Sequence, residues 1–186
     1  MATAKRLGAL VFGYDVRAAT VDQIQSVGAK AVLSLEAITE GNQEKQRELL
    51  TAALLEADAV VTTALIPGGK APILIPTATI QKMKHGAIIV DLAAERGGNT
   101  EITRLGETVI ENGVSVIGPI NLSSSAPGQA SQMFTKNVAA FLKLAIKDGR
   151  LSVDLSDEIL RGTLMSPTET TKEIAVPQKD LAAAAG

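Results

Sequence analysis

Short apolar, β-branched runs alternate along the chain with segments whose apolar residues recur at helical spacing. This alternation predicts strands that each lead into a helix, and the scarcity of polar residues in the strands is typical of strands covered on both faces. The pattern therefore predicts an α/β fold with a parallel sheet. The five expected strands are Leu10–Tyr14, Ala31–Leu35, Ala59–Thr63, Ala87–Asp91 and Val114–Ile117.

Capping and stop signals define the expected helices. Thr20 and Gln23 form a capping box that predicts a helix ending at Gly28. Three further helices are expected at Gln43–Ala57, Thr77–Lys84 and Gln129–Lys147, followed by a strand-like piece at Leu151–Leu155. In the longest helix, one face is expected to be buried and consists of Phe134, Val138, Phe141, Leu142 and Ala145.

Composition narrows the function classes. Apolar residues make up 46% of the 186 residues, which is enough for a sizeable core. A net charge of −2 and an aromatic content of 2% argue against nucleic-acid binding. The absence of cysteine excludes thiolate metal sites, and the acidic residues show no metal-loop spacing. No run approaches the roughly 18 apolar residues of a membrane-spanning helix, so we expect a soluble, cytoplasmic chain.

The residues just after each strand carry the candidate chemistry, because ligands of parallel sheets bind beyond the carboxyl ends of the strands. Asp15 follows the first strand, where an acidic residue can accept hydrogen bonds from the adenosine ribose of a dinucleotide. Its charge would repel a 2′-phosphate and so favours NAD(H). The neighbouring Arg17 could cover the adenine face. The alternative is that Asp15 is only a solvated carboxylate paired with Arg17.

A phosphate-binding glycine loop is expected about 20 residues before such an acid. No G-x-G-x-x-G motif occurs in the sequence, and the expected position falls before residue 1. We therefore expect a Rossmann-like, doubly wound parallel sheet that lacks its first strand and its glycine loop. Residues Ala2–Leu7 would be the last turn of the helix after that strand.

Several ordered motifs resemble the alanine dehydrogenase and nicotinamide nucleotide transhydrogenase alpha-subunit family, and the transhydrogenase branch in particular. The motifs are YDVR at 14–17, TTALIPG at 62–68, VDLAAERGGN at 90–99, and Ala130-Ser131 with Phe134 and Asn137. The resemblance implies three parts. These are a truncated NAD(H)-binding Rossmann domain at 1–128, a return helix with a C-terminal piece of a second domain at 129–165, and a flexible tail at 166–186.

The resemblance also implies the cofactor contacts, although it carries over no catalytic residue and no metal ligand. Asp15, Val16 and Arg17 would lie at the adenosine ribose, and Gly41 matches a mobile-loop glycine. The other implied contacts are Ala64 and Leu65 beside the cofactor, Asp91, Leu92 and Ala93 under the nicotinamide ribose, and Asn121 near the nicotinamide.

The activity implied for intact relatives is proton-translocating hydride transfer between NAD(H) and NADP(H). NADP(H) would lie on a partner domain, and a membrane domain would hold the assembly at the cytoplasmic face of the inner membrane. The implied partners are the missing N-terminal half, those two domains and, in the intact enzyme, a second copy; this chain alone is expected to be inactive. Two alternatives stay open, an alanine dehydrogenase fragment and a non-catalytic remnant that pairs with a companion subunit.

Overall fold

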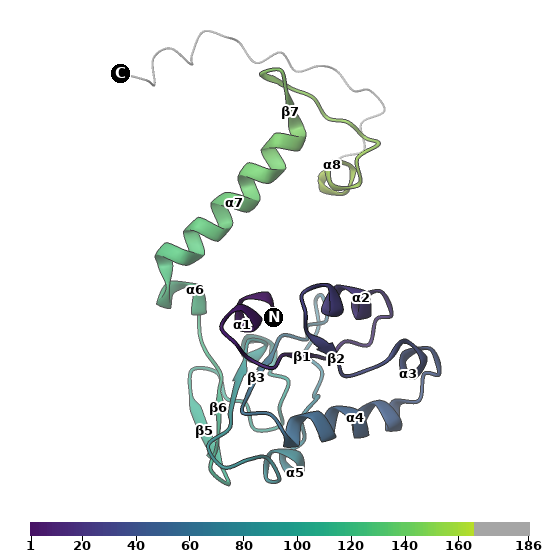
Figure 1. Cartoon of the computed structure of the whole chain (residues 1–186). Coiled ribbons are helices and arrows are strands. Elements are labelled where there is room, and N and C mark those ends of the chain that lie inside the picture. Colours follow the sequence, from purple (N-terminus) through teal and green to yellow (C-terminus); the bar gives the residue numbers. More distant parts are fainter. Residues whose placement is uncertain (166–186) are drawn as a thin grey trace. The chain divides into compact units, whose positions relative to one another are not determined.

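A computed structural model describes residues 1–165 of the chain. The described residues divide into two compact units, one of Met1–Ile120 and one that begins at Asn121 (Figure 1). The predicted domain boundary after residue 128 stays a prediction, and the predicted tail at 166–186 lies outside the described residues.

The first unit contains a four-stranded sheet and a separate two-stranded sheet. The larger sheet has the order β3-β4-β6-β5, in which β3, β4 and β6 are parallel. The two strands of the smaller sheet are parallel as well. The predicted α/β class with a mainly parallel sheet is confirmed. The strands are β1 Phe12–Gly13, β2 Lys30–Ala31, β3 Ala59–Thr62, β4 Ile88–Asp91, β5 Thr108–Glu111 and β6 Val114–Ile117.

Strand β5 was not among the predicted strands, and it pairs antiparallel with β6 at the edge of the sheet. The two strands form a hairpin whose turn residues Asn112 and Gly113 have φ values of 47° and 76°. Positive φ at both positions defines the tight turn that matches the twist of a hairpin, and Asn-Gly is its strongest sequence signal. The Asn-Gly dipeptide was therefore the sequence signal that could have predicted this hairpin and with it strand β5.

Two of the helices of the first unit begin at a polar residue whose side chain accepts a hydrogen bond from the first turn. The Ser34 hydroxyl accepts a hydrogen bond from the Ala37 amide at 3.2 Å, which starts a short helix that the sequence did not predict. The predicted capping role of Thr20 is wrong, because its hydroxyl lies inside a helix and donates to the Arg17 carbonyl at 2.6 Å. The helices are α1 Ala2–Arg6, α2 Ala19–Ser26, α3 Leu35–Thr39, α4 Gln43–Leu55, α5 Thr77–Ile80 and the 3₁₀ helix η1 Ala94–Arg96.

The core of this unit lies on one face of the four-stranded sheet. Leu54 of α4 and Ile80 of α5 pack there against strand residues that include Ile89 and Val116. The opposite face is exposed among the described residues: Val61, Ile88 and Ile110 retain 63%, 41% and 70% of their accessible surface. The apolar run in β4 was predicted to be buried on both faces. That prediction is wrong within this structure.

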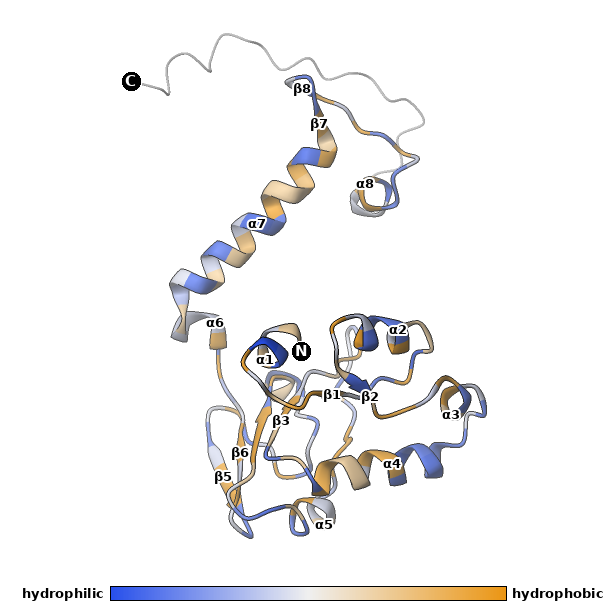
Figure 2. Ribbon diagram, viewed as in Figure 1, coloured by the Kyte–Doolittle hydropathy of each residue, from blue (hydrophilic) through white to orange (hydrophobic). Residues whose placement is uncertain are grey.

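The second unit is built around the helix predicted at Gln129–Lys147, which the structure places at α7 (Figure 1). Ala145 is buried as expected, whereas Phe134 is 71% exposed and Val138 and Leu142 are also exposed. Apolar residues recur along this helix (Figure 2), but within residues 1–165 no helix is long and apolar enough to cross a membrane. The elements are α6 Leu122–Ser125, α7 Pro127–Ala145, β7 Ile146–Lys147, β8 Arg150–Leu151 and α8 Glu158–Thr163.

Candidate functional site

The carboxyl ends of β3 and β4 are joined by a buried carboxylate. Asp91 ends β4 and has no exposed surface. A carboxylate without water is costly to bury unless its oxygens accept several hydrogen bonds. Its Oδ1 accepts from the Thr62 hydroxyl at 2.9 Å and the Ala93 amide at 3.0 Å. Its Oδ2 accepts from the amides of Asn99 and Thr100 at 2.6 and 3.3 Å and from the Thr103 hydroxyl at 2.6 Å.

Asn99 extends this arrangement to the loop after β3. Its side-chain amide donates to the carbonyls of Ala64 and Pro72 at 2.9 and 2.8 Å, and its Oδ1 accepts from the Ala64 amide at 3.0 Å. Asn99 is fully buried, so these bonds satisfy its polar atoms. The backbone of Ala64 is therefore fixed relative to Asp91, and we name the pair Asp91 and Asn99 the strand-end clamp.

Gly98 allows the clamp to close. Its φ of +85° lies in the left-handed region, and a Cβ added to it would lie 2.5 Å from the Cβ of Thr103 and 2.8 Å from Oδ2 of Asp91. A side chain at this position would therefore push apart the groups that Asp91 holds together.

Asp15 follows β1 and forms an ion pair with Arg17. The Arg17 Nη2 lies 2.8 Å from Oδ2 of Asp15, while its Nε and backbone amide both donate to Oδ1 at 3.0 and 2.9 Å. The hydrogen bond from the Arg17 side chain is the main reason why the pKa of Asp15 is lowered. Burial raises the pKa of the adjacent Tyr14 hydroxyl. This pairing with Arg17 is the one expected under the alternative interpretation, in which Asp15 is a solvated carboxylate; its role at the ribose stays a prediction.

The remaining predicted contacts of the first unit lie at its surface. The side chains of Val16 and Leu65 are each 57% exposed and that of Leu92 is 39% exposed. Gly41 lies between α3 and α4 with a φ of +65°, and its amide donates to the Ile38 carbonyl at 3.1 Å. Among the described residues, no side-chain hydrogen bond connects any of these four to Asp91 or Asn99 of the strand-end clamp.

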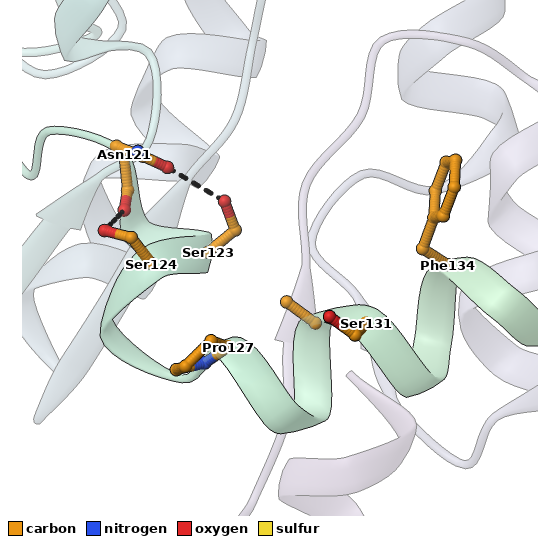
Figure 3. A pocket seen from close by; sticks show the side chains of 7 residues that line it. Asn121, Ser123, Ser124, Pro127, Ser131 and Phe134 are labelled. Carbon is orange, nitrogen blue, oxygen red and sulfur yellow. Dashed lines mark hydrogen bonds between the residues drawn. The ribbon is translucent and has the colours of Figure 1, made fainter.

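Asn121 belongs to the second unit. It has a φ of +46° just before α6, and its Oδ1 accepts from the Ser123 hydroxyl at 3.0 Å (Figure 3). It borders an open surface hollow that α6 and the start of α7 form, with Pro127, Ser131 and Phe134 also at its rim.

The structure thus connects three of the predicted contacts, Ala64, Asp91 and Ala93, through hydrogen bonds. The residue that sequence reasoning missed is Asn99, which stands at the end of the VDLAAERGGN motif without a predicted role. Its signal was the pair of glycines before it, since Gly97 and Gly98 both have positive φ and orient the asparagine inward. Within residues 1–165, no group of three or more histidines and carboxylates could hold a metal ion.

Comparison with known proteins identifies the family. A family model described as "Alanine dehydrogenase/PNT, C-terminal domain" matches residues 1–172. The chain belongs to this family. It is 40% identical over 182 residues to the first segment of the NAD(P) transhydrogenase alpha subunit of Rhodospirillum rubrum, and 38% identical over 179 residues to that of Rickettsia prowazekii. Each alignment covers 89% of this chain but only 47% and 46% of the relative, so the chain spans about half the length of these relatives.

Solved structures give the same grouping. The transhydrogenase from Sinorhizobium meliloti is similar with a TM-score of 0.67 and 38% identity, covering 86% of this chain and 44% of that one. An L-alanine dehydrogenase is similar with a TM-score of 0.60 and 25% identity, covering 75% and 38% of the two chains. The resemblance of the sequence to the transhydrogenase alpha subunit is thereby confirmed.

Proposed function

We propose that this chain supplies part of the NAD(H) site of a proton-translocating NAD(P) transhydrogenase, in which hydride passes between NAD(H) and NADP(H). The observation that carries the proposal is the acidic residue Asp15 two positions after a strand of a Rossmann-like unit, in a chain about 40% identical to transhydrogenase alpha subunits. The weaker likeness to L-alanine dehydrogenase supports the transhydrogenase branch.

The residues of this chain fit a role in placing the cofactor. The Asp15 carboxylate is partly exposed, and each oxygen has lone pairs beyond those that Arg17 uses, so it can accept from ribose hydroxyls. The strand-end clamp fixes the backbone of Ala64 and Ala93, next to the exposed side chains of Leu65 and Leu92. These two loops would form a rigid wall beside the ribose and nicotinamide.

The bound nicotinamide supplies the hydride chemistry, and this chain's residues would bind and orient it. NADP(H) would bind on a partner domain, and a membrane domain would couple the transfer to proton movement. The region of the relatives that this chain does not span, those two domains and a second copy are the proposed partners. The proposed location is the cytoplasm, or the cytoplasmic face of the inner membrane through those partners.

The test compares NADH and NADPH binding to the full chain by amide chemical-shift titration, a measurement that detects weak binding. We expect a dissociation constant well above the low micromolar range, because the glycine loop that holds the pyrophosphate is absent from the sequence. We also expect shifts at Asp15, Arg17, Leu65 and Leu92. A failure to detect any shift with NADH at millimolar concentration would overturn the proposal.

The variant Asp15→Ala should weaken NADH binding by about tenfold, the equivalent of roughly 1.4 kcal/mol. It should also reduce the ratio of NADH affinity to NADPH affinity, because it removes both the acceptor for the ribose hydroxyls and the charge that repels the 2′-phosphate. The control is Asp22→Ala, which removes the same charge from an exposed position in α2. If both variants change the NADH-to-NADPH ratio equally, Asp15 does not face the ribose.

A further inference from the structure

The turn between β5 and β6 contains a dipeptide with a chemistry of its own. Of the five asparagines in the sequence, Asn112 is the one that a glycine follows. The side chain of an asparagine is open to attack by the backbone nitrogen of the next residue, and a glycine, which has no side chain, hinders that attack least. Neither the proposed cofactor site nor the strand-end clamp uses this dipeptide.

The fold requires both residues at this turn. Asn112 and Gly113 have φ values of 47° and 76°, and asparagine and glycine are the residues that adopt this left-handed region most readily. A Cβ added to Gly113 would lie 2.6 Å from Nδ1 of His85, so a larger residue would also press against the imidazole ring. The hairpin therefore cannot replace the glycine by a residue that shields the preceding asparagine.

The reacting groups of the dipeptide are accessible. Both residues are exposed, and within residues 1–165 the Gly113 amide donates no hydrogen bond. Asn99 is the opposite case, because it is buried and three hydrogen bonds hold its side chain. The attacking nitrogen and the side-chain amide of the turn are thus open to water, as the reaction needs.

Three hydrogen bonds attach the turn to the segment between α5 and β4. The Asn112 side-chain amide donates to the Gln81 carbonyl at 2.6 Å, and the Gln81 side chain donates to the Glu111 carboxylate at 2.7 Å. The Gly86 amide donates to the Gly113 carbonyl at 2.9 Å. We name these three bonds the turn latch. Since β5 pairs with β6 alone among the described strands, the latch is a second attachment for this edge of the sheet.

We propose that Asn112 is a site of spontaneous deamidation in the folded protein, and that the reaction opens the turn latch. The Gly113 nitrogen attacks Cγ of Asn112, so an N–Cγ bond forms and the Cγ–Nδ2 bond breaks. Ammonia leaves and takes up the proton of the Gly113 amide. A water molecule then adds to either carbonyl carbon of the cyclic imide and opens the ring, which gives aspartate or isoaspartate. Water is the co-reactant, and nothing is oxidised or reduced.

The products lack the donor that the latch needs. Either product carries a carboxylate in place of the Asn112 amide, and a carboxylate cannot donate to the Gln81 carbonyl. It also adds a negative charge beside the carboxylate of Glu111. Isoaspartate in addition routes the main chain through Cβ, so the turn gains a backbone atom and no longer fits a two-residue hairpin. We expect β5 to loosen, whereas β6 stays paired with β4 on its other edge.

Peptide mass spectrometry of the folded full chain tests the reaction. The protein is incubated at mildly alkaline pH, where backbone amides lose their proton more readily, and conversion is followed by the mass gained when OH replaces NH₂. Asn112 should convert at least about tenfold faster than Asn121. Asn121 is the matched control, because it is exposed with a φ of 46° but is followed by Leu122. Equal conversion of the two asparagines, or conversion of Asn112 only after unfolding in urea, would overturn the proposal.

Amide hydrogen exchange tests whether the latch opens. After conversion, the amides of β5 should exchange at least about tenfold faster than in the intact protein, while those of β4 keep their rate. Asn112→Asp should show part of this effect, since it removes the donor and adds the charge without changing the backbone path. Unchanged exchange of β5 in the converted protein would contradict the opening of the latch.

The control for the incubation is Asn112→Gly. This variant cannot deamidate at the turn, and two glycines still favour the tight hairpin. Its β5 amides should therefore exchange at the same rate before and after the incubation, and an increase equal to that of the natural chain would mean that another change loosens β5. These measurements use no nucleotide, so their outcome does not depend on the proposed cofactor role.

Discussion

The two faces of the four-stranded sheet differ although the same apolar strands form both. In β4, Ile89 has no exposed surface, whereas its neighbour Ile88 is 41% exposed. Helices α4 and α5 supply Leu54 and Ile80 to the covered face. The uncovered face offers a row of exposed apolar side chains instead. The apolar residues of a strand therefore predict that both faces of the sheet can be buried, whereas the helices that pack on the sheet determine which face is buried.

The largest effect should come from a matched pair of adjacent isoleucines. Ile89→Ala should lower the free energy of unfolding by about 4 kcal/mol, because it leaves a cavity in the core. Ile88→Ala should lower it by about 1 kcal/mol or less, since much of that side chain is already in water. Urea denaturation measures both. Similar losses would mean that the second face is covered in solution.

The strand-end clamp lies on the covered side, and its removal should come next in size. Asp91→Asn replaces one acceptor oxygen by an NH₂ group that confronts amide and hydroxyl donors, so we expect a loss of about 3 kcal/mol in the free energy of unfolding. The control is Asp58→Asn, whose carboxylate is 91% exposed. A loss below about 1 kcal/mol for Asp91→Asn would show that the five hydrogen bonds add little.

Substitutions at two neighbouring glycines test how closely the groups around Asp91 are packed. Gly98→Ala should cost about 2 kcal/mol more than Gly97→Ala in the free energy of unfolding. Both positions have positive φ and share the backbone strain of an alanine there. Only at Gly98 would the new methyl group meet Thr103 and Asp91, while nothing lies within 4 Å at Gly97. Thermal unfolding measures both variants. If they lower the free energy of unfolding equally, the loss comes from backbone strain alone and not from contact with Thr103 and Asp91.

Local pattern was sufficient for strands that consist mainly of apolar and β-branched residues. The strand at Val114–Ile117 has the predicted bounds, and β3 ends one residue earlier than predicted. Where a short polar signal interrupts a run, the prediction failed. The expected strand Ala31–Leu35 is shortened to Lys30–Ala31 because the Ser34 hydroxyl starts helix α3 instead.

The strand-end positions of Asp91 and Ala64 could be predicted from the sequence, whereas the hydrogen bonds that connect them could not; their contact with a cofactor stays a prediction. The carboxyl ends of the strands identified Asp91 and Ala64 as residues of interest, since the ends of parallel strands meet at one edge. The bond between Ala64 and Asn99 joins positions 35 residues apart, and no periodicity specifies such a contact. This contact depends on the tertiary structure, because a buried amide side chain must form hydrogen bonds with whichever groups the fold places beside it.

The smallest effect on stability is expected from the ion pair between Asp15 and Arg17 after β1. This pair is exposed to solvent, whereas the carboxylate of Asp91 is buried. Arg17→Gln removes the charged side-chain donor that mainly lowers the pKa of Asp15, so this pKa should rise toward its ordinary value. The backbone amide of residue 17 can still donate, which limits the rise. Carbon-detected titration of the Asp15 carboxyl measures the change.

The sign of the accompanying pH dependence follows from the direction of the shift. Because folding lowers the pKa of Asp15, its contribution to stability is complete above the ordinary pKa of an aspartate and is lost as the pH falls through the lowered value. Arg17→Gln should therefore reduce stability slightly near neutral pH and flatten its acid dependence, within the small range of exposed ion pairs. Lys45→Gln breaks the exposed pair with Glu40 and should leave the Asp15 titration unchanged. If Arg17→Gln also leaves it unchanged, the pair seen at the end of β1 does not persist in solution, and Asp15 is free to accept from a ligand without competition.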